Sequence, residues 1–211
     1  MSRVAIVAAL EREVRPLVKD WRVTEKEHDG RRFRFFEKGD VVLVCAGVGG
    51  GAARRAAEAV ISNFAPELIC SAGFAGALDP KLSVGDVIRP EFVINAGDGS
   101  RVSLGSGAGI LVSFGSVASP EQKAKLRESY GAQAVDMEAA AVGRSAETHG
   151  IRFAAVKVIS DAVNFEFPSM MAGAMISRRG LRTVGILCFS RIDPEACKFG
   201  RCLPMGPKFS S

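Results

Sequence analysis

The chain contains no apolar run that approaches the roughly 20 residues needed to cross a bilayer. Its N-terminus, Met-Ser-Arg followed by VAIVAAL, lacks the length and the small-residue cleavage pattern of a secretory signal. Internal repeats and low-complexity linkers are also missing. These absences argue against a membrane-spanning or secreted protein and predict a soluble one.

Cysteine is scarce, and its spacing suggests no pairing. The five cysteines are Cys45, Cys70, Cys188, Cys197 and Cys202. The last three form no C-x-x-C pair and no histidine follows His149, so the pattern of a zinc site is lacking. The first two lie in apolar runs, where a thiol behaves as a small core residue. We therefore expect no disulfide framework, no metal and a reducing, cytoplasmic compartment.

The composition fits one compact domain with an unusual distribution of charge. The 211 residues are 47% hydrophobic and 24% charged, with a net charge of +5. Residues 1–167 hold equal numbers of basic and acidic side chains, so the excess lies in residues 168–211. We treat 1–167 as the main part of the domain and 168–211 as an atypical basic C-terminal segment. Its dispersed aromatics form no recognisable module, so we expect no nucleic-acid partner.

Segments typical of strands and helices alternate along the chain. Apolar and β-branched runs predict strands at residues 3–9, 31–37, 41–46, 67–72, 82–94 (after a polar break at 85–86), 109–114 and 153–159. Other segments predict helices at 11–19, 52–63 and 137–149, and Ser119-Pro120-Glu121-Gln122 is a capping box that starts a further helix. Nearly continuous apolar strands between helices predict an α/β fold whose mostly parallel sheet is covered on both faces.

Polar or glycine-rich residues follow several of these strands. In open α/β sheets the ligand lies beyond the carboxyl ends of the strands. Four groups fall there: Glu11 and Glu13, the glycine cluster 47–51, Gly73-Phe74-Ala75-Gly76, and Ser160-Asp161. We expect them to converge at one edge of the sheet.

Each group also has a purely structural explanation. The glycine cluster would let backbone N–H groups approach an anion or a sugar, but its spacing does not match G-x-G-x-x-G, and a tight strand-to-helix turn also accounts for it. Asp161 is placed to act as a general acid or simply to cap a helix. Asp136 and Glu138 flank Met137 where acids favour a helix N-terminus, and Glu13 on a helix would ordinarily be solvated.

Five segments together resemble one family. They are AALEREV (8–14), CAGVGGGAA (45–53), SAGFAGALDPKLSVGDVI (71–88), AVDMEAAAVG (134–143) and VKVISDAV (156–163). In this order and spacing they are similar to the nucleoside phosphorylase and nucleosidase superfamily, nearest to its 5′-methylthioadenosine/S-adenosylhomocysteine nucleosidases and the hopanoid-associated phosphorylases. The resemblance implies a three-layer α/β sandwich with a central mixed, partly barrel-like sheet, assembled as a homodimer or larger homo-oligomer.

The resemblance also implies roles for the matching residues. Asp161 corresponds to the acid that protonates or hydrogen-bonds purine N7, Ser160 to its support, and Glu13 to the glutamate that positions or activates the attacking water. Glu138 would accept hydrogen bonds from the ribose hydroxyls and Met137 would pack under the ribose. The substrate-binding set that follows is Met137, Glu138, Asp136, Ser160, Gly73, Phe74, Gly47 and Gly49.

Two departures from the family pattern bear on the reaction. Relatives usually have Ser or Thr where this chain has Phe74, and phosphorylases have Arg where it has Ser71. The loss of both groups removes phosphate donors and favours hydrolysis. The family's closing amphipathic helix is not evident after Pro168.

The sequence therefore predicts hydrolysis of the N-glycosidic bond of a purine nucleoside, with adenine favoured and no cofactor. Two alternatives stay open. One is phosphorolysis, with phosphate as co-substrate. The other is a catalytically silent nucleoside-binding protein on the same scaffold.

Overall fold

The computed structural model describes residues 3–166, which form one mixed sheet of 11 strands with four helices. The strands are β1 (Val4–Ala8), β2 (Arg22–His28), β3 (Arg31–Lys38), β4 (Val41–Cys45), β5 (Leu68–Ala77), β6 (Val87–Ile88), β7 (Phe92–Asn95), β8 (Arg101–Ser103), β9 (Ile110–Ser113), β10 (Ala134–Asp136) and β11 (Arg152–Asp161). The helices are α1 (Glu11–Val18), α2 (Gly50–Phe64), α3 (Pro120–Tyr130) and α4 (Ala139–Thr148).

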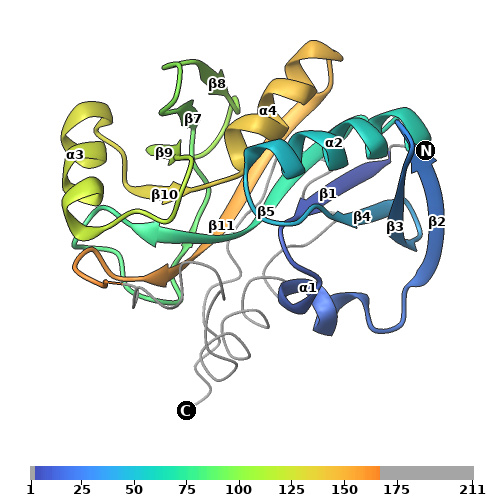
Figure 1. Cartoon of the computed structure of the whole chain (residues 1–211), viewed down its shortest axis with the longest axis horizontal. Helices are drawn as coiled ribbons and strands as arrows, with labels where there is room; N and C mark the ends of the chain where they lie inside the picture. The colour runs from blue at the N-terminus through green and yellow to red at the C-terminus, as the bar shows by residue number, and fades with distance from the viewer. Residues whose placement is uncertain (1–2, 167–211) are drawn as a thin grey trace.

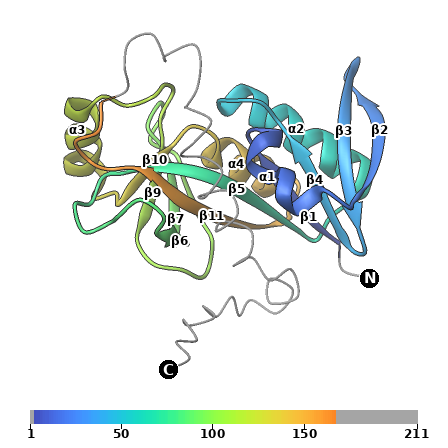
Figure 2. The same cartoon turned by 90° about the horizontal axis from the view of Figure 1, so that it is seen from below.

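The long strand β5 is the branch point of the sheet. It pairs in parallel with β1 and β11 and antiparallel with β10. From β1 the sheet continues through β4 to the antiparallel strands β3 and β2, and from β10 it continues through β9 and β7 to β8. The β2–β3 hairpin and α3 consequently lie at opposite ends of the molecule (Figure 2).

Helices cover both faces of the sheet, as the alternation of apolar strands predicts. Helices α2 and α4 pack together over one face, and α1 lies on the other (Figure 1). Small residues let the helices pack closely: Ala53, Ala56 and Ala57 of α2 are fully buried, and Gly143 lets α4 approach β11, because a Cβ there would lie 2.8 Å from the Phe153 ring. The expected α/β fold with a central mixed sheet is confirmed.

Several predicted boundaries are wrong, and the reasons are local. Strand β5 continues to Ala77, so Gly73 to Gly76 lie inside it instead of after it. Helix α4 begins at Ala139, so residues 137 and 138 precede it. Strands β2, β8 and β10 are not predicted by the sequence pattern. Strand β2 is a polar strand at the edge of the sheet, and the other two have only three residues each, too short for a periodic pattern.

Some expectations fall on residues outside 3–166. These are the basic segment 168–211, the expectation that no closing amphipathic helix follows Pro168, and Cys188, Cys197 and Cys202. Within the described part of the chain, Cys45 and Cys70 form no disulfide, and no helix is long and apolar enough to cross a membrane.

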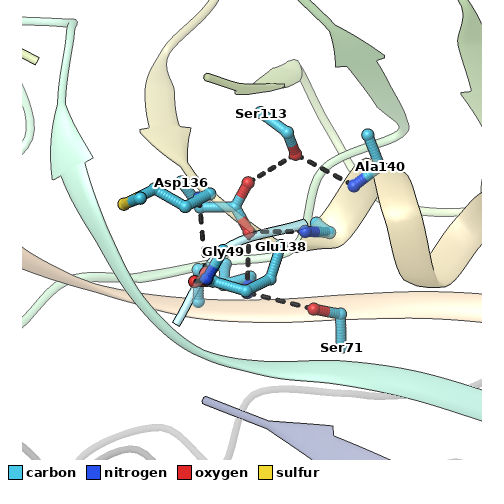
Figure 3. A network of polar contacts seen from close by, with 9 residues as sticks. Gly49, Ser71, Ser113, Asp136, Glu138 and Ala140 are labelled. Atoms are coloured by element: carbon cyan, nitrogen blue, oxygen red, sulfur yellow. Dashed lines mark hydrogen bonds and ion pairs between the residues drawn. The ribbon is translucent and has the colours of Figure 1, made fainter. Parts of the chain in front are cut away.

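A small buried network builds the N-terminus of α4 (Figure 3). The Ser113 hydroxyl at the end of β9 donates to Asp136 Oδ1 at 2.5 Å and accepts the Ala140 N–H at 2.9 Å. Asp136 Oδ2 accepts the Ala139 N–H at 2.9 Å. Two N–H groups that a helix start leaves without intrahelical partners are thereby satisfied, and the chain just before α4 is held in place.

We expect Ser113→Ala to lower the free energy of unfolding by about 1–3 kcal/mol, because it leaves a buried carboxylate oxygen and a buried N–H without their partner. Urea denaturation measures the change. Ser103→Ala is the control, since Ser103 is exposed at the end of β8, and should alter stability by less than about 0.5 kcal/mol. Equal effects of the two substitutions would contradict the structural role of Ser113.

Candidate active site

A cavity of about 250 Å³ lies where β5, β10, β11 and α1 approach one another. Seven of the residues expected from the sequence line it: Glu13, Phe74, Asp136, Met137, Glu138, Ser160 and Asp161. Three of the four groups that were expected to converge therefore place predicted site residues in the lining of one cavity. The glycine cluster contributes Val48 instead of a glycine.

The three candidate glycines lie behind this lining. Gly49 adopts φ 92° at the N-cap of α2, and its N–H donates to Glu138 Oε1 at 2.8 Å. The Gly47 N–H donates to the Ala9 carbonyl at 2.8 Å. A Cβ on Gly73 would lie 3.4 Å from Glu13 Oε2, so the glycine lets that carboxylate approach β5. In this structure the N–H groups of Gly47 and Gly49 are used within the protein.

Lys157 is a buried cation that does not line the cavity but contacts Asp136, which does. It lies in β11 and is 1% exposed, with Nζ 2.8 Å from Asp136 Oδ2 and 3.0 Å from the Ser71 hydroxyl. Burial alone would lower the pKa of Lys157, but the carboxylates of Asp136, Glu138 and Glu13 outweigh it and raise the pKa. The ammonium therefore stays charged and compensates the acids around it.

Glu138 is held by backbone groups on two sides. Oε1 accepts the Gly49 N–H, and Oε2 accepts the Met137 N–H at 3.3 Å. Burial raises the pKa of Glu138 and nearby Lys157 opposes that shift. Each carboxylate oxygen can accept a second hydrogen bond, so Glu138 retains capacity to bind a hydroxyl in the cavity.

Glu13 is buried, in contrast to the solvated position usual for an acid on a helix. It is 3% exposed, and Oε2 has no hydrogen-bond partner among the described residues. Burial raises the pKa of Glu13 to about 7, although the N-terminal turn of α1 and Lys157 act in the opposite direction. A carboxylate with a pKa near neutrality and an open acceptor suits a general base.

Asp161 ends β11 and is held by two donors. The Ser160 hydroxyl lies 2.6 Å from Oδ1, and Lys123 Nζ of α3 lies 2.5 Å from Oδ2. Both charged side chains are almost completely buried, at 7% exposure for Asp161 and 1% for Lys123. The ammonium also donates to the Ala162 carbonyl at 2.7 Å.

Sequence reasoning missed Lys123, Lys157 and Ser113. Lys157 stands inside the apolar strand FAAVKVI, and a lysine there has to be paired if the strand is buried. Lys123 lies three residues before buried Leu126 on the same face of α3. The sequence therefore indicated that both lysines could be buried, but it did not indicate which carboxylate pairs with each of them.

No cluster of three or more His, Cys, Asp or Glu side chains within residues 3–166 could hold a metal ion. The charges in the cavity are instead arranged as carboxylates with two buried lysines. The rest of the lining is largely apolar and includes Val48, Phe74 and Met137.

The fold and the site define an α/β enzyme whose carboxylate-lined cavity lies at strand ends of a mixed sheet. The sequence profile of the phosphorylase superfamily matches residues 3–112 and 108–173. The chain therefore belongs to the phosphorylase superfamily, which confirms the resemblance carried by its motifs.

Proteins named 5′-methylthioadenosine/S-adenosylhomocysteine nucleosidase are similar to the chain. That of Marinomonas sp. (strain MWYL1) is 33% identical over 99 residues, which covers 45% of this chain and 42% of the relative. That of Staphylococcus aureus (strain bovine RF122 / ET3-1) is 26% identical over 202 residues, or 77% of this chain and 88% of the relative. The crystal structure of the Campylobacter jejuni nucleosidase has a TM-score of 0.73 at 19% identity and covers 88% of this chain and 94% of that one, so the two share a fold.

The raised pKa of Glu13 predicts a pH-dependent effect on stability. Its carboxyl ionises near pH 7 in the folded protein and near the ordinary value of 4.5 in the unfolded chain. Between these values the folded state binds more protons, so the contribution of Glu13 to stability falls as the pH rises. Glu13→Gln cannot ionise and should become more stable than the wild type by about 1–3 kcal/mol at pH 8, with little difference at pH 4.5.

Urea denaturation at the two pH values measures this difference. Glu11→Gln is the matched control because Glu11 lies on the same helix with a half-exposed side chain. We expect its effect to be the same at both pH values. A Glu13→Gln effect that did not grow with pH would show that Glu13 titrates normally.

Proposed function

We propose that this protein hydrolyses the N-glycosidic bond of a purine nucleoside, with a preference for adenine as the base. Cleavage of N-glycosyl bonds is the enzyme class that follows from its family and relatives. The observation that supports hydrolysis is the buried Glu13 in the same cavity as Asp161. One of its oxygens has no hydrogen-bond partner among residues 3–166, and its pKa is raised to about 7.

Asp161 is the residue assigned to the leaving group. A purine leaves more readily when N7 accepts a proton or a strong hydrogen bond as the N9–C1′ bond breaks. Asp161 lines the cavity and is oriented by Ser160. Asp161 therefore acts on the base, and other residues act on the sugar.

Glu138 is assigned to the sugar. As the base departs, positive charge develops on the ribose ring, and a fixed carboxylate nearby stabilises it. The bonds from Gly49 and Met137 hold Glu138 in place before substrate arrives, so little reorganisation is needed during the reaction. Met137 lines the same part of the cavity and supplies an apolar surface for the ribose.

Glu13 is assigned to the nucleophile. Its carboxylate takes a proton from water as the water adds to C1′, and a base with a pKa near 7 is well suited to that transfer at neutral pH. A phosphate nucleophile fits less well, because Ser71 is already bonded to Lys157 and Phe74 offers no donor. Both observations favour hydrolysis over phosphorolysis.

The relatives support a particular substrate class. The Staphylococcus aureus protein is named for 5′-methylthioadenosine and S-adenosylhomocysteine, both adenine nucleosides with a sulfur substituent at C5′. We propose an adenine nucleoside of this type for the present chain. The proposal extends to a homodimer or larger homo-oligomer in the cytoplasm, as the family resemblance implies.

Release of free adenine from adenosine, 5′-methylthioadenosine and S-adenosylhomocysteine tests the function. We expect release without phosphate and no formation of a sugar 1-phosphate when phosphate is added. Asp161→Asn and Glu13→Gln should each lower kcat/KM by roughly 10²- to 10⁴-fold, since each removes one proton-transfer group. Chromatography of the base and the sugar measures both reactions.

The Glu11→Gln variant serves as the control and should retain wild-type activity, because Glu11 pairs with Arg34 on the surface. Phosphate-dependent release of a sugar 1-phosphate would replace hydrolysis by phosphorolysis. Nucleoside binding without base release, unchanged in Asp161→Asn, would identify a silent binding protein instead.

A further inference from the structure

The ion pair between Lys123 and Asp161 has no role in the mechanism given above. Lys123 projects from α3, and its ammonium contacts Asp161 Oδ2 at 2.5 Å and the Ala162 carbonyl at 2.7 Å. Both side chains line the cavity. A lysine that is 1% exposed and lies at the edge of a ligand cavity is a costly feature, because its charge is removed from water.

The surrounding strand leaves room for this pair. Gly76 of β5 lies against it, and a Cβ at that position would be 2.8 Å from Asp161 Oδ2 and 3.3 Å from Lys123 Cε. A side chain there would push the carboxylate and the ammonium aside. The contact thus depends on three segments that are distant in sequence: α3, β5 and β11.

The pair places a second proton donor next to the acid assigned to the leaving group. Asp161 accepts hydrogen bonds from Ser160 at Oδ1 and from Lys123 at Oδ2. Each oxygen of Asp161 therefore already accepts a hydrogen bond, and the Lys123 ammonium is a proton donor in direct contact with Oδ2.

We propose that Lys123 is a positioning residue that acts through Asp161 and supplies the proton that Asp161 passes to the purine. This inference rests on the proposed function. As the N9–C1′ bond breaks, its electron pair stays on the purine, Asp161 gives a proton to N7, and Lys123 gives one to Asp161. The base leaves neutral. Water adds to C1′ and its proton goes to Glu13, and solvent then reprotonates Lys123 and deprotonates Glu13.

Lysine and arginine differ in the property that this role requires. Lysine can lose its proton within a buried pair, whereas an arginine guanidinium cannot be deprotonated in a protein. Lys123→Arg keeps the positive charge beside Asp161 but removes the proton supply. Lys123→Met removes both and keeps a similar length. The two variants therefore separate proton supply from electrostatic orientation.

The experiment compares an adenine nucleoside that the wild type hydrolyses with its 2-fluoro derivative, whose base is a better leaving group. We expect both Lys123 variants to lower kcat for the parent nucleoside by roughly 10²-fold or more, as for loss of a general acid. The ratio of kcat for the 2-fluoro derivative to kcat for the parent should rise by about 10-fold or more, because cleavage without proton donation depends more strongly on the leaving group. KM should change little.

Lys125→Met is the matched control, since Lys125 is exposed on the same helix and should leave both the rate and the ratio unchanged. Circular dichroism and activity on the 2-fluoro derivative report whether each variant is folded. Wild-type activity of Lys123→Arg, or an equal loss on both nucleosides in both variants, would overturn the inference while leaving the proposed function intact. Absence of base release by the wild type would overturn both.

Discussion

The buried ion pair between Lys157 and Asp136 is the interaction on which the rest of the site depends. It joins β11 to the end of β10, and the Lys157 ammonium also donates to the Ser71 hydroxyl of β5. Removing one partner of such a pair costs about 3–5 kcal/mol, because the other charge is left buried. Asp136 also receives hydrogen bonds from Ser113 and from the first turn of α4. The same carboxylate therefore balances a charge and sets where Met137 and Glu138 emerge into the cavity.

Two buried lysines divide the cavity into regions of different chemistry. Lys157 compensates Asp136 and nearby Glu138, and Lys123 is paired with Asp161, the acid assigned to the base. Glu13 has neither lysine as a hydrogen-bond partner, and burial raises its pKa to about 7. Carboxyl groups with such different surroundings can take opposite roles in proton transfer at one pH. The acids are chemically similar, so the difference between their roles comes from the cation or hydrogen-bond donor that each one contacts.

The alternation of apolar strands and helices was enough to predict the fold class and most strands of the sheet. The capping box at Ser119 was also predicted and is formed as expected, with the Gln122 N–H donating to the Ser119 hydroxyl. Motif resemblance placed Glu13, Glu138 and Asp161 among the candidates, and they line one cavity. Strand β2 was missed because an edge strand exposed to water has a polar sequence. Lys123 and Lys157 were not predicted as site residues, because the hydrophobic periodicity that indicates a helix or a strand is little changed by one charged residue.

The sequence by itself determined the order of the helices and of most strands, the superfamily and several of the acids that line the cavity, because periodicity and motifs are local properties of the chain. Only the tertiary structure decided which acid meets a lysine, which is left without one, and that a backbone N–H of the glycine turn binds Glu138. Those contacts join residues 38 positions apart in the Lys123–Asp161 pair and 89 apart in the Gly49–Glu138 bond. The protonation and orientation of a buried carboxylate depend on the atoms within a few ångströms of it, and folding alone brings those atoms together.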